Sequence, residues 1–559
     1  MKKQYDVIII GAGIAGLTNA ALLSKAGFSC CVIEKEPVVG GCIQGFKRKG
    51  FEFDTAIHWL NQCGEDGMGT RVFQLIGTDY PRTVEMKNIF RYKSKNTDYL
   101  LTNKPDELKE ELIKDFPHEE KGIRKLFRVA KKIGKASERF KFMIRTKESM
   151  SIVERIIFSL NSFITIIPMI PYAMYDGDKG IKKGLNKYFF KDERLHKLYS
   201  SEKDLLSCIF PIAWAYVNDY QIPITGGAKN YTLWLKYVTE HFNNDVITKA
   251  TVNKITFNDK TATGVIFTKD GKEQSISSKY VIAACDVETL YKKMLPKEIV
   301  SNKFLSKLDN AILYASGVSI SIALDCPARE IGINDENISI TREDVPRENH
   351  ETGDPLTSAM FVSAPSERDE TLVPEGKGDI HIYVLGRVEY NNYWQTDGFK
   401  NGEYIRGEKY KKHKEEYTKI VIDRVEKELG IDIQSHILFT DTATPITYIR
   451  YTGNKDGSIM GARPGRANMQ AKIAHYKTPI NNLFLSGHWA ELGGGVPIAA
   501  QTALNSTLLI LQKENKNLFK ILAKYSDGKI TIDEVLNSEL LKKYNNSWKQ
   551  VPTSNENKD

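Results

Sequence analysis

The chain has 559 residues, 41% of them apolar and 27% charged, which is the balance of an ordinary globular protein long enough for two subdomains around a large core. The formal net charge of +9 suits an anionic membrane surface or an acidic-headed substrate, although a soluble protein with neither partner could carry it too. No cluster of lysine and arginine with interleaved aromatic residues occurs, which argues against a nucleic-acid-binding protein.

The cysteines and the first residues bear on redox chemistry and location. The seven cysteines are scattered and form no Cys-x-x-Cys pair, so we expect neither a zinc ribbon nor a disulfide framework, and we predict no metal site. Met1–Lys3 before an apolar run imitates a signal peptide. Asp6 and a glycine motif lie in that run, however, and cleavage would destroy the motif. We therefore expect a cytoplasmic protein.

The first 36 residues predict a strand, a glycine turn, a helix and a second strand. Residues 7–10 form a short apolar run, typical of a strand buried on both faces. Gly11, Gly13 and Gly16 follow in Gly-x-Gly-x-x-Gly spacing. The first glycine permits the tight turn, the second lets the backbone approach a pyrophosphate, and the third lets the helix lie close to the strand. The second strand ends on Glu34, which can accept hydrogen bonds from ribose hydroxyls. The sequence therefore predicts an adenine dinucleotide site.

Two further glycine motifs indicate which dinucleotide is bound. Gly40 and Gly41 follow Glu34, and such a pair in flavoproteins supports a flavin dinucleotide that runs inward. Residues 482–489 predict a strand, and a glycine-rich turn at 493–497 leads into a long apolar helix whose N-terminus could face the isoalloxazine ring. We therefore expect one non-covalent FAD. The alternative is a nicotinamide enzyme that uses the same first motif.

These motifs resemble the phytoene desaturase, carotenoid isomerase and retinol saturase family of FAD enzymes. The resemblance covers most of the chain in four patches, at residues 6–59, 223–284, 444–461 and 482–506. Within the first patch, residues 53–59 (Phe-Asp-Thr-Ala-Ile-His-Trp) are similar to the retinol saturase branch more than to the desaturases.

The chain departs from the family pattern at three positions. The family usually has arginine after the glycine pair, glycine two residues after the aspartate of the first patch, and often aspartate after the glycine of the last strand. Here these residues are Cys42, Ala56 and His488. The departures bear on individual cofactor contacts rather than on FAD binding itself.

Together, the motifs and the resemblance imply a set of site residues. Nearest the flavin ring we place His58, Trp59 and His488 as candidate catalytic residues. The alternative for either histidine is a purely structural role, with its hydrogen bonds made inside the protein. By resemblance, the backbone of Val252 should contact the adenine edge. The expected cofactor-binding residues are Gly11, Gly13, Ile14, Ala15, Gly16, Glu34, Lys35, Gly41, Cys42, Val252, Gly487, Val496 and Pro497.

The resemblance implies oxidoreduction or isomerisation of carbon–carbon double bonds in a long apolar molecule that is carotenoid-like, retinoid-like or fatty-acyl-like. No second dinucleotide fingerprint occurs, because Gly453, Gly457 and Gly461 follow no strand–helix pattern. Electrons must therefore come from or leave to an external partner, or the flavin must return to its starting state in each turnover. We favour an isomerase or saturase over a desaturase. A flavin amine oxidase and a non-catalytic prenyl-binding protein on the same fold are the alternatives.

The positions of these motifs also predict the domain organisation of the chain. Residues 1–95, 222–300 and 440–515 should form a discontinuous FAD-binding domain around one parallel sheet. Residues 96–221 and 301–439 should form a substrate region, and 516–559 a polar C-terminal tail that ends in disorder. Within the substrate region, the alternation at 316–325 and 379–385 predicts half-buried strands of an antiparallel sheet, and 409–430 predicts an amphipathic helix over it. The fold class is thus α/β, Rossmann-type, with a second domain of antiparallel sheet plus helices.

One uncharged run, residues 156–175, is long enough for a transmembrane helix. Asn161, Ser162 and two prolines would weaken a lone span, so a span is the least favoured interpretation. A buried lid over the substrate channel and a monotopic element that dips into a membrane remain open. The lysines that follow, from Lys179 to Lys187, slightly favour the second and predict peripheral membrane association.

Overall fold

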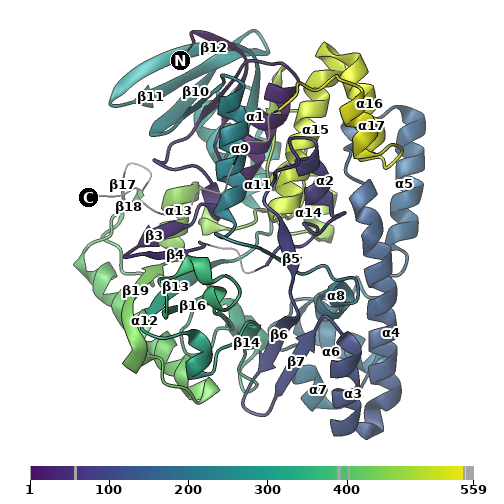
Figure 1. Ribbon diagram of the computed structural model, residues 1–559, viewed down its shortest axis with the longest axis vertical. Helices are drawn as coiled ribbons and strands as arrows, with labels where there is room; N and C mark the ends of the chain where they lie inside the picture. The colour runs from purple at the N-terminus through teal and green to yellow at the C-terminus, as the bar shows by residue number, and fades with distance from the viewer. Residues whose placement is uncertain (1, 56–58, 387–391, 401–402, 545–547, 549–559) are drawn as a thin grey trace.

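The computed structural model describes residues 2–55, 59–386, 392–400, 403–544 and 548. In this part of the chain two seven-stranded sheets are surrounded by helices (Figure 1). One sheet lies in the upper part of Figure 1, the second lies below it on the left, and a group of helices lies below on the right. The predicted fold class, a Rossmann-type sheet with a second region of antiparallel sheet plus helices, is confirmed.

The first sheet is the Rossmann sheet, and strands far apart in the sequence build it. Two strands, β10 (Ala250–Asn258) and β11 (Thr261–Lys269), extend it in antiparallel fashion. Val7, Ile8 and Ile9 of the central strand have no exposed surface, as the apolar run predicts. The parallel strands lie in the order β9 (Asp245–Ile247), β2 (Cys30–Ile33), β1 (Gln4–Ile10), β12 (Lys272–Ala283) and β20 (Leu483–Leu485).

Helices from both ends of the chain pack on one another beside this sheet. Asn19 of the first helix is fully buried, and its amide nitrogen donates to Ser486 Oγ at 2.8 Å while its oxygen accepts from Ser506 Oγ at 3.0 Å. This side chain therefore joins the N-terminal and C-terminal segments of one domain. The helices are α1 (Ile14–Lys25), which packs against α9 (Lys229–His241) and α15 (Val496–Glu514), and α2 (Met68–Gln74), which packs against α15.

The second sheet is antiparallel except where its strands at residues 337–340 and 88–93 pair in parallel. Residues 88–93 lie within the predicted first flavin segment, yet they form a strand of this second sheet. In order, the strands are β19 (Ile437–Ala443), β13 (Ser316–Leu324), β16 (Gly378–Gly386), β15 (Met360–Ser363), β14 (Asn337–Ile340), β6 (Asn88–Lys93) and β7 (Asp98–Thr102).

The two strands predicted from alternating sequence are present, and β13 pairs with β16 from Ser316 opposite Gly386 to Leu324 opposite Gly378. The expectation that they are half-buried was wrong, because every residue of β13 and nearly every residue of β16 is buried. Helix α12 (Glu408–Leu429) lies over one face, as predicted, and Phe51 and Phe53 pack against Ala323 on the other. The serines that produce the alternation in β13 are therefore buried as well, and Ser319 hydrogen-bonds to Tyr448 instead of facing solvent.

The helices at the lower right of Figure 1 pack around a separate apolar core that includes Leu126, Phe127 and Ile209. They are α3 (Pro105–Asp115), α4 (Glu120–Ser137), α6 (Gly177–Tyr188), α7 (Glu193–Lys197) and α8 (Leu205–Ala215).

The segment after Asn515 was expected to be a polar tail, and the structure corrects this for its first part. Helices α16 (Lys516–Ser526) and α17 (Ile532–Asn537) follow α15 directly. Leu518, Leu522 and Tyr525 are buried on one face of α16. Their helical spacing carries enough apolar surface to hold this segment on the Rossmann domain despite the surrounding lysines.

The uncharged run at 156–175 forms the greater part of α5 (Ile152–Ile166) and the turns that follow it. Only Thr165 of this helix is buried, so α5 is not the buried lid that one interpretation expected. Among the described residues, no helix is both long and apolar enough to cross a bilayer.

The buried Asn19 network gives a first prediction. Asn19→Ala should lower the free energy of unfolding by about 2–4 kcal/mol, because Ser486 and Ser506 lose a buried hydrogen-bond partner. The exposed Asn253, which bonds to Thr268 on the sheet surface, is the matched control, and Asn253→Ala should change stability by less than about 0.5 kcal/mol. Urea denaturation of both variants measures the difference, and equal midpoints would contradict the structural role of Asn19.

Candidate cofactor and substrate site

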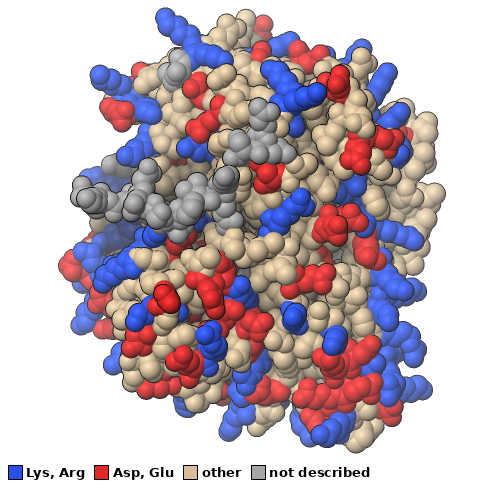
Figure 2. All heavy atoms as spheres, in the orientation of Figure 1, with Lys and Arg blue, Asp and Glu red and all other residues tan. Residues whose placement is uncertain are grey.

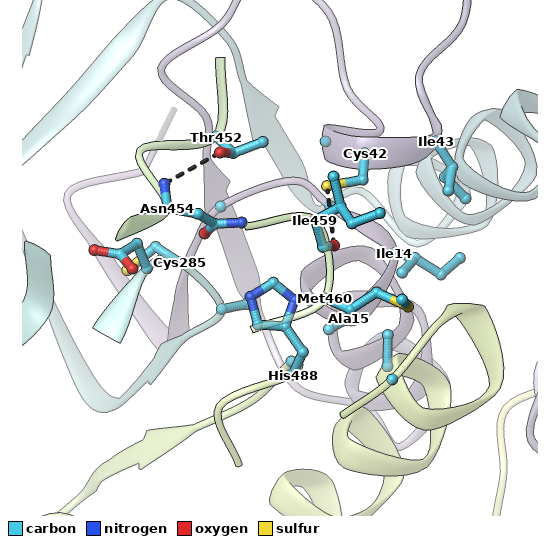
Figure 3. A pocket seen from close by; sticks show the side chains of 18 of the residues that line it. Ile14, Ala15, Cys42, Ile43, Cys285, Thr452, Asn454, Ile459, Met460 and His488 are labelled. Carbon is cyan, nitrogen blue, oxygen red and sulfur yellow. Dashed lines mark hydrogen bonds between the residues drawn. The ribbon is translucent and has the colours of Figure 1, made fainter. Parts of the chain in front are cut away.

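A cavity of about 1540 Å³ begins at the carboxyl ends of β1 and β2 and continues between the domains. One end is lined by backbone of the glycine turn, by Glu34 and by residues 250–253, and the other by Phe210, Trp214, Phe361 and other apolar side chains. Figure 3 shows part of this cavity, with the His488 ring projecting among Ile459, Met460 and Asn454. Ligands of parallel α/β sheets bind at this edge.

Each of the three glycines of the first motif has a different geometric role. Gly11 has φ +100°, and a Cβ there would lie 2.7 Å from the Ala284 carbonyl oxygen. A Cβ on Gly16 would lie 1.9 Å from the Gly11 carbonyl oxygen, so α1 approaches β1 as closely as it does only with glycine at this position. A Cβ on Gly13 would meet no protein atom within 4 Å. Gly13 therefore keeps open a space that the fold itself does not fill.

Glu34 supports the glycine turn as well as facing the cavity. Its Oε2 accepts from the Ala12 N–H at 2.7 Å, and its Oε1 accepts from the Glu36 N–H at 2.9 Å. Each carboxylate oxygen retains a lone pair toward a ligand, so the expected contact with ribose hydroxyls remains a prediction. The neighbouring Lys35 donates through Nζ to the Arg450 carbonyl oxygen at 2.7 Å, which ties the third sequence patch to the end of β2.

The glycine pair closes over the first turn. Gly41 has φ +56°, and a Cβ there would come within 3.3 Å of Gly13 Cα, while the Gly40 N–H donates to the Ala12 carbonyl oxygen at 2.9 Å. Cys42 follows, where the family usually has arginine, and its Sγ lies 3.9 Å from the Ile459 carbonyl oxygen (Figure 3). Burial raises the pKa of Cys42 to about 11, so its thiol stays protonated and unreactive at neutral pH.

The last sequence patch completes the cofactor end of the cavity. The Gly487 N–H donates to Thr502 Oγ1 at 2.8 Å, which packs the turn after β20 on α15. Helix α15 begins at Val496 and Pro497, both of which line the cavity, and no side chain caps its first turn. Its free amide groups and positive dipole end are therefore available to a polar ligand group in the cavity.

His488 lies in the cavity where the resemblance suggested a residue near the flavin. A Cβ on Gly461, which has φ +68°, would come within 2.4 Å of the His488 ring, so that glycine permits the ring's position. Burial lowers the pKa of His488 to about 4, and the imidazole is therefore neutral at physiological pH. A neutral ring can donate one hydrogen bond and accept another, but it carries no charge to stabilise an anion.

Of the other two candidate catalytic residues, the structure describes only Trp59. Trp59 lines the cavity, donates through Nε1 to Asn61 Oδ1 at 3.0 Å, and meets Phe90 edge to face at 5.0 Å between ring centroids. It belongs with the core of the helical group. His58 lies outside the described residues. The candidate roles of Trp59, His58 and His488 remain predictions, as do those of Ile14, Ala15 and Val252, which also line the cavity.

The patches that carried the family resemblance converge in space. The Ala228 N–H, at the start of α9, donates to Asp54 Oδ1 at 3.2 Å, which joins the first patch to the second. Tyr448 in the third patch donates through its hydroxyl to the Thr55 carbonyl oxygen at 3.1 Å. These contacts give residues 53–55 a positioning role at the junction of the two domains.

Sequence reasoning missed Asp219, a buried carboxylate that lines the aromatic part of the cavity. Its oxygens accept from the Gln62 backbone N–H at 2.5 Å and from Gln62 Nε2 at 2.7 Å. Burial raises the pKa of Asp219 to about 6 against these hydrogen bonds. No motif surrounds Asp219 in the sequence, so no sequence signal identified it.

A parallel sheet with a tight glycine turn and a cavity over its carboxyl edge defines a Rossmann-type dinucleotide-binding protein. A family model described as an NAD(P)-binding Rossmann-like domain matches residues 9–76. Among solved structures, a putrescine oxidase variant is similar with a TM-score of 0.58 and 15% identity, over 91% of this chain and 99% of that one. An oxidoreductase from Methanosarcina mazei gives 0.54 and 17%, over 91% and 100%. These likenesses show the fold alone.

Relatives by sequence match nearly the whole chain. An all-trans-retinol 13,14-reductase from Danio rerio is 28% identical, over 88% of this chain and 84% of the relative. An inactive all-trans-retinol 13,14-reductase from Danio rerio is 22% identical, over 92% and 89%. A chloroplastic prolycopene isomerase from Daucus carota is 24% identical, over 88% and 78%. These matches confirm the resemblance to the retinol saturase and carotenoid isomerase family.

The different surroundings of Gly13 and Gly16 give the second prediction. In flavin-free protein, Gly13→Ala should leave the free energy of unfolding within about 0.5 kcal/mol of wild type, because its Cβ enters open space. The same variant should weaken FAD binding at least about tenfold, because the methyl group occupies the space that a phosphate needs. Gly16→Ala should instead destabilise the apoprotein by about 1–3 kcal/mol through its contact with Gly11. Urea denaturation and FAD titration separate the two effects, and unimpaired FAD binding by Gly13→Ala would refute the assignment.

The raised pKa of Asp219 gives the third prediction. The folded protein holds this proton more tightly than the unfolded chain, so the group's contribution to stability is full below about pH 4 and is lost as the pH rises through about 6. Between those pH values the stability of wild type should therefore fall by up to about 3 kcal/mol relative to Asp219→Asn. Urea denaturation of both proteins at several pH values tests this. Parallel pH curves would show that Asp219 does not titrate in this range.

Proposed function

We propose that this protein is an FAD-dependent enzyme that acts on carbon–carbon double bonds of a long apolar polyene. The observation that carries the proposal is one continuous cavity whose polar end has the features of a dinucleotide site and whose other end is lined by aromatic side chains. Relatives named for reactions of retinol and of prolycopene support the substrate class.

The residues at the polar end fit FAD. The open space beside Gly13 and the uncapped start of α15 offer backbone amide groups at two separated points of the cavity. In this assignment the glycine turn holds the pyrophosphate, with Gly11 and Gly13 facing it and Gly16 keeping the helix close behind them. Glu34 holds the adenosine ribose, and the backbone of Val252 the adenine edge. FAD, when bound, supplies hydride transfer to or from a carbon centre.

The aromatic end suits an apolar substrate. Phe140, Phe210, Trp214, Phe361 and Tyr383 line it, and they come from the helical group and from the second sheet. Their faces exclude water and bind an extended conjugated chain by apolar contact, without fixing it through many hydrogen bonds. Trp59 and His488 are the residues that we place beside the reacting double bond.

Reduction of a double bond requires a proton on one carbon as well as a hydride on the other. Asp219 is a titratable side chain at the aromatic end, and Gln62 holds its carboxyl group in place. With a pKa of about 6, roughly a tenth of the Asp219 population holds a proton at pH 7 and can release it. We assign it the proton-donating role in a saturase, whereas an isomerase would need no net proton.

Retinol saturase and carotenoid isomerase reactions differ in their electron balance. A saturase consumes two electrons per turnover and requires an external donor, whereas an isomerase regenerates its flavin. The relative that is named inactive makes a non-catalytic, ligand-binding protein a specific second candidate. The two candidates differ in whether a bound polyene leaves chemically changed.

The test uses purified full-length protein reconstituted with FAD, with the flavin oxidised in one set of reactions and chemically reduced in another. We expect the wild-type protein to be yellow and to convert members of a panel of retinoids and carotenoids. If the reaction is saturation, the Asp219→Asn variant should lose most of its kcat and keep its flavin spectrum. Conversion of amines alone would make it an amine oxidase. Polyene binding without conversion by either flavin state would favour the non-catalytic candidate.

A further inference from the structure

Helix α5 presents its apolar side chains to the outside of the molecule. Ile156 is 65% exposed, Leu160 59% and Phe163 55%, and the flanking Ile152 and Ile166 are exposed as well. At about 100° per residue, the exposed isoleucine, leucine and phenylalanine residues cover roughly half the circumference of the helix. A surface helix of a globular protein normally turns such a face toward its core. On α5 the apolar face instead points toward solvent.

The inversion is fixed by the fold, because α5 is fastened at both ends. At its start, Ser151 and Glu154 form a capping box, and the buried Arg145 pairs with Glu154 at 2.6 Å and with Asp527 at 3.2 Å. Beyond its end, Tyr172 is buried in the helical core and stacks on Phe189 at 5.7 Å between centroids. These anchors prevent the helix from rotating its apolar face inward.

Charged and aromatic side chains gather at both ends of this uncharged face. At one end lie Arg155 and Lys147, whose ammonium group sits 5.7 Å from the Phe158 ring centroid. Past the other end lie Lys183 and Lys187, with Lys187 Nζ 4.9 Å from the Tyr188 ring centroid. In Figure 2 the right edge over α5 is mostly tan, with blue side chains below it. Lysine, arginine and tyrosine around an apolar band are typical of the headgroup level of a bilayer.

We propose that α5 and the turns after it, residues 152–174, form a monotopic docking surface that lies in the interfacial region of an anionic lipid bilayer. The helix is about 22 Å long at 1.5 Å per residue, which suits a position parallel to the membrane plane. Lipid contacts a half-circumference face evenly, whereas a helical seam with a second copy uses a narrower stripe. The C-terminal residues 549–559 carry too few apolar side chains to cover this face.

The position of α5 also suggests how an apolar ligand reaches the cavity. Ser137, Phe140 and Met143, which line the cavity, lie at the end of α4 and in the segment that leads on toward α5. A polyene dissolved in the bilayer would therefore meet the cavity beside the docking surface. This second part rests on the proposed function, whereas membrane docking does not.

The experiment is flotation of purified full-length protein with phosphatidylcholine vesicles, with or without phosphatidylserine, at low and high salt. Wild-type protein should float with both vesicles, and more tightly with the anionic ones at low salt. The double variant Ile156→Asp with Leu160→Asp should lower the partition coefficient at least about a hundredfold, because two aliphatic side chains no longer enter the lipid. The milder pair Ile156→Ser with Leu160→Ser should lower it by about tenfold or more.

The matched control is Leu356→Asp with Leu438→Asp, two leucines of similar exposure (56% and 47%) away from α5. The control should float like wild type, and the far-UV circular dichroism spectrum of all variants should be unchanged, which shows that they fold. The proposal is overturned if wild type does not float, or if the α5 variants float as well as wild type. A wild-type dimer that forms without lipid, does not float and is lost in the α5 variants would also overturn it, because a second copy of the chain would then cover this face. Flotation requires no substrate, so it can succeed while the polyene assay fails.

Discussion

The close approach of α1 to β1 is the constraint on which the cofactor end of the molecule depends. Because Gly16 has no side chain, α1 can start directly over the end of β1, with the Gly11 carbonyl group in contact with Gly16. That approach fixes where the Gly13 backbone lies, and the Glu34 carboxylate holds the turn through the Ala12 N–H. The glycine pair at 40–41 then packs on this turn rather than on a side chain. This backbone contact thus sets the shape of the glycine turn at the polar end of the cavity.

Burial determines the charge state of the groups that line this cavity. His488 is neutral because its pKa falls to about 4, and Cys42 is a neutral thiol because its pKa rises to about 11. Burial raises the pKa of Asp219 only to about 6 because hydrogen bonds from Gln62 oppose the shift, so this carboxyl group is mostly ionised at neutral pH. The aromatic end, lined mainly by residues such as Phe140, Phe210 and Trp214, suits an apolar substrate, because each ionised group there would need water or a partner that such a substrate cannot supply.

Helix α5 reverses the usual relation between burial and polarity. Its anchors, Arg145 at one end and Tyr172 at the other, hold an apolar face outward, where water makes the exposure unfavourable. The same surface is favourable in contact with lipid, so the arrangement makes sense for a protein that works at a membrane surface. Ser137, Phe140 and Met143 line the cavity and precede α5 in the chain, which is the basis of the proposed entry of a ligand beside that surface.

Local patterns in the sequence were sufficient for the features that depend on neighbouring residues. The spacing of Gly11, Gly13 and Gly16 after an apolar strand predicted the turn and the first helix, because strand, turn and helix are joined by short-range geometry. The same holds for the glycine turn before Val496 and for the amphipathic helix α12. The alternation in β13 predicted a strand but not its burial, because whether a second layer covers a face depends on distant residues.

Only the tertiary structure decided which side chains meet. Asp219 is 157 residues from Gln62 in the sequence, and nothing in either neighbourhood indicates that they bond. Asn19 likewise finds its partners more than 460 residues away. The sequence by itself showed that residues 156–175 are uncharged, and it left a buried lid and a membrane element open, with the lysines that follow slightly favouring the second. The fold placed that face outside, because solvent exposure is a property of how all the elements pack and not of the segment itself.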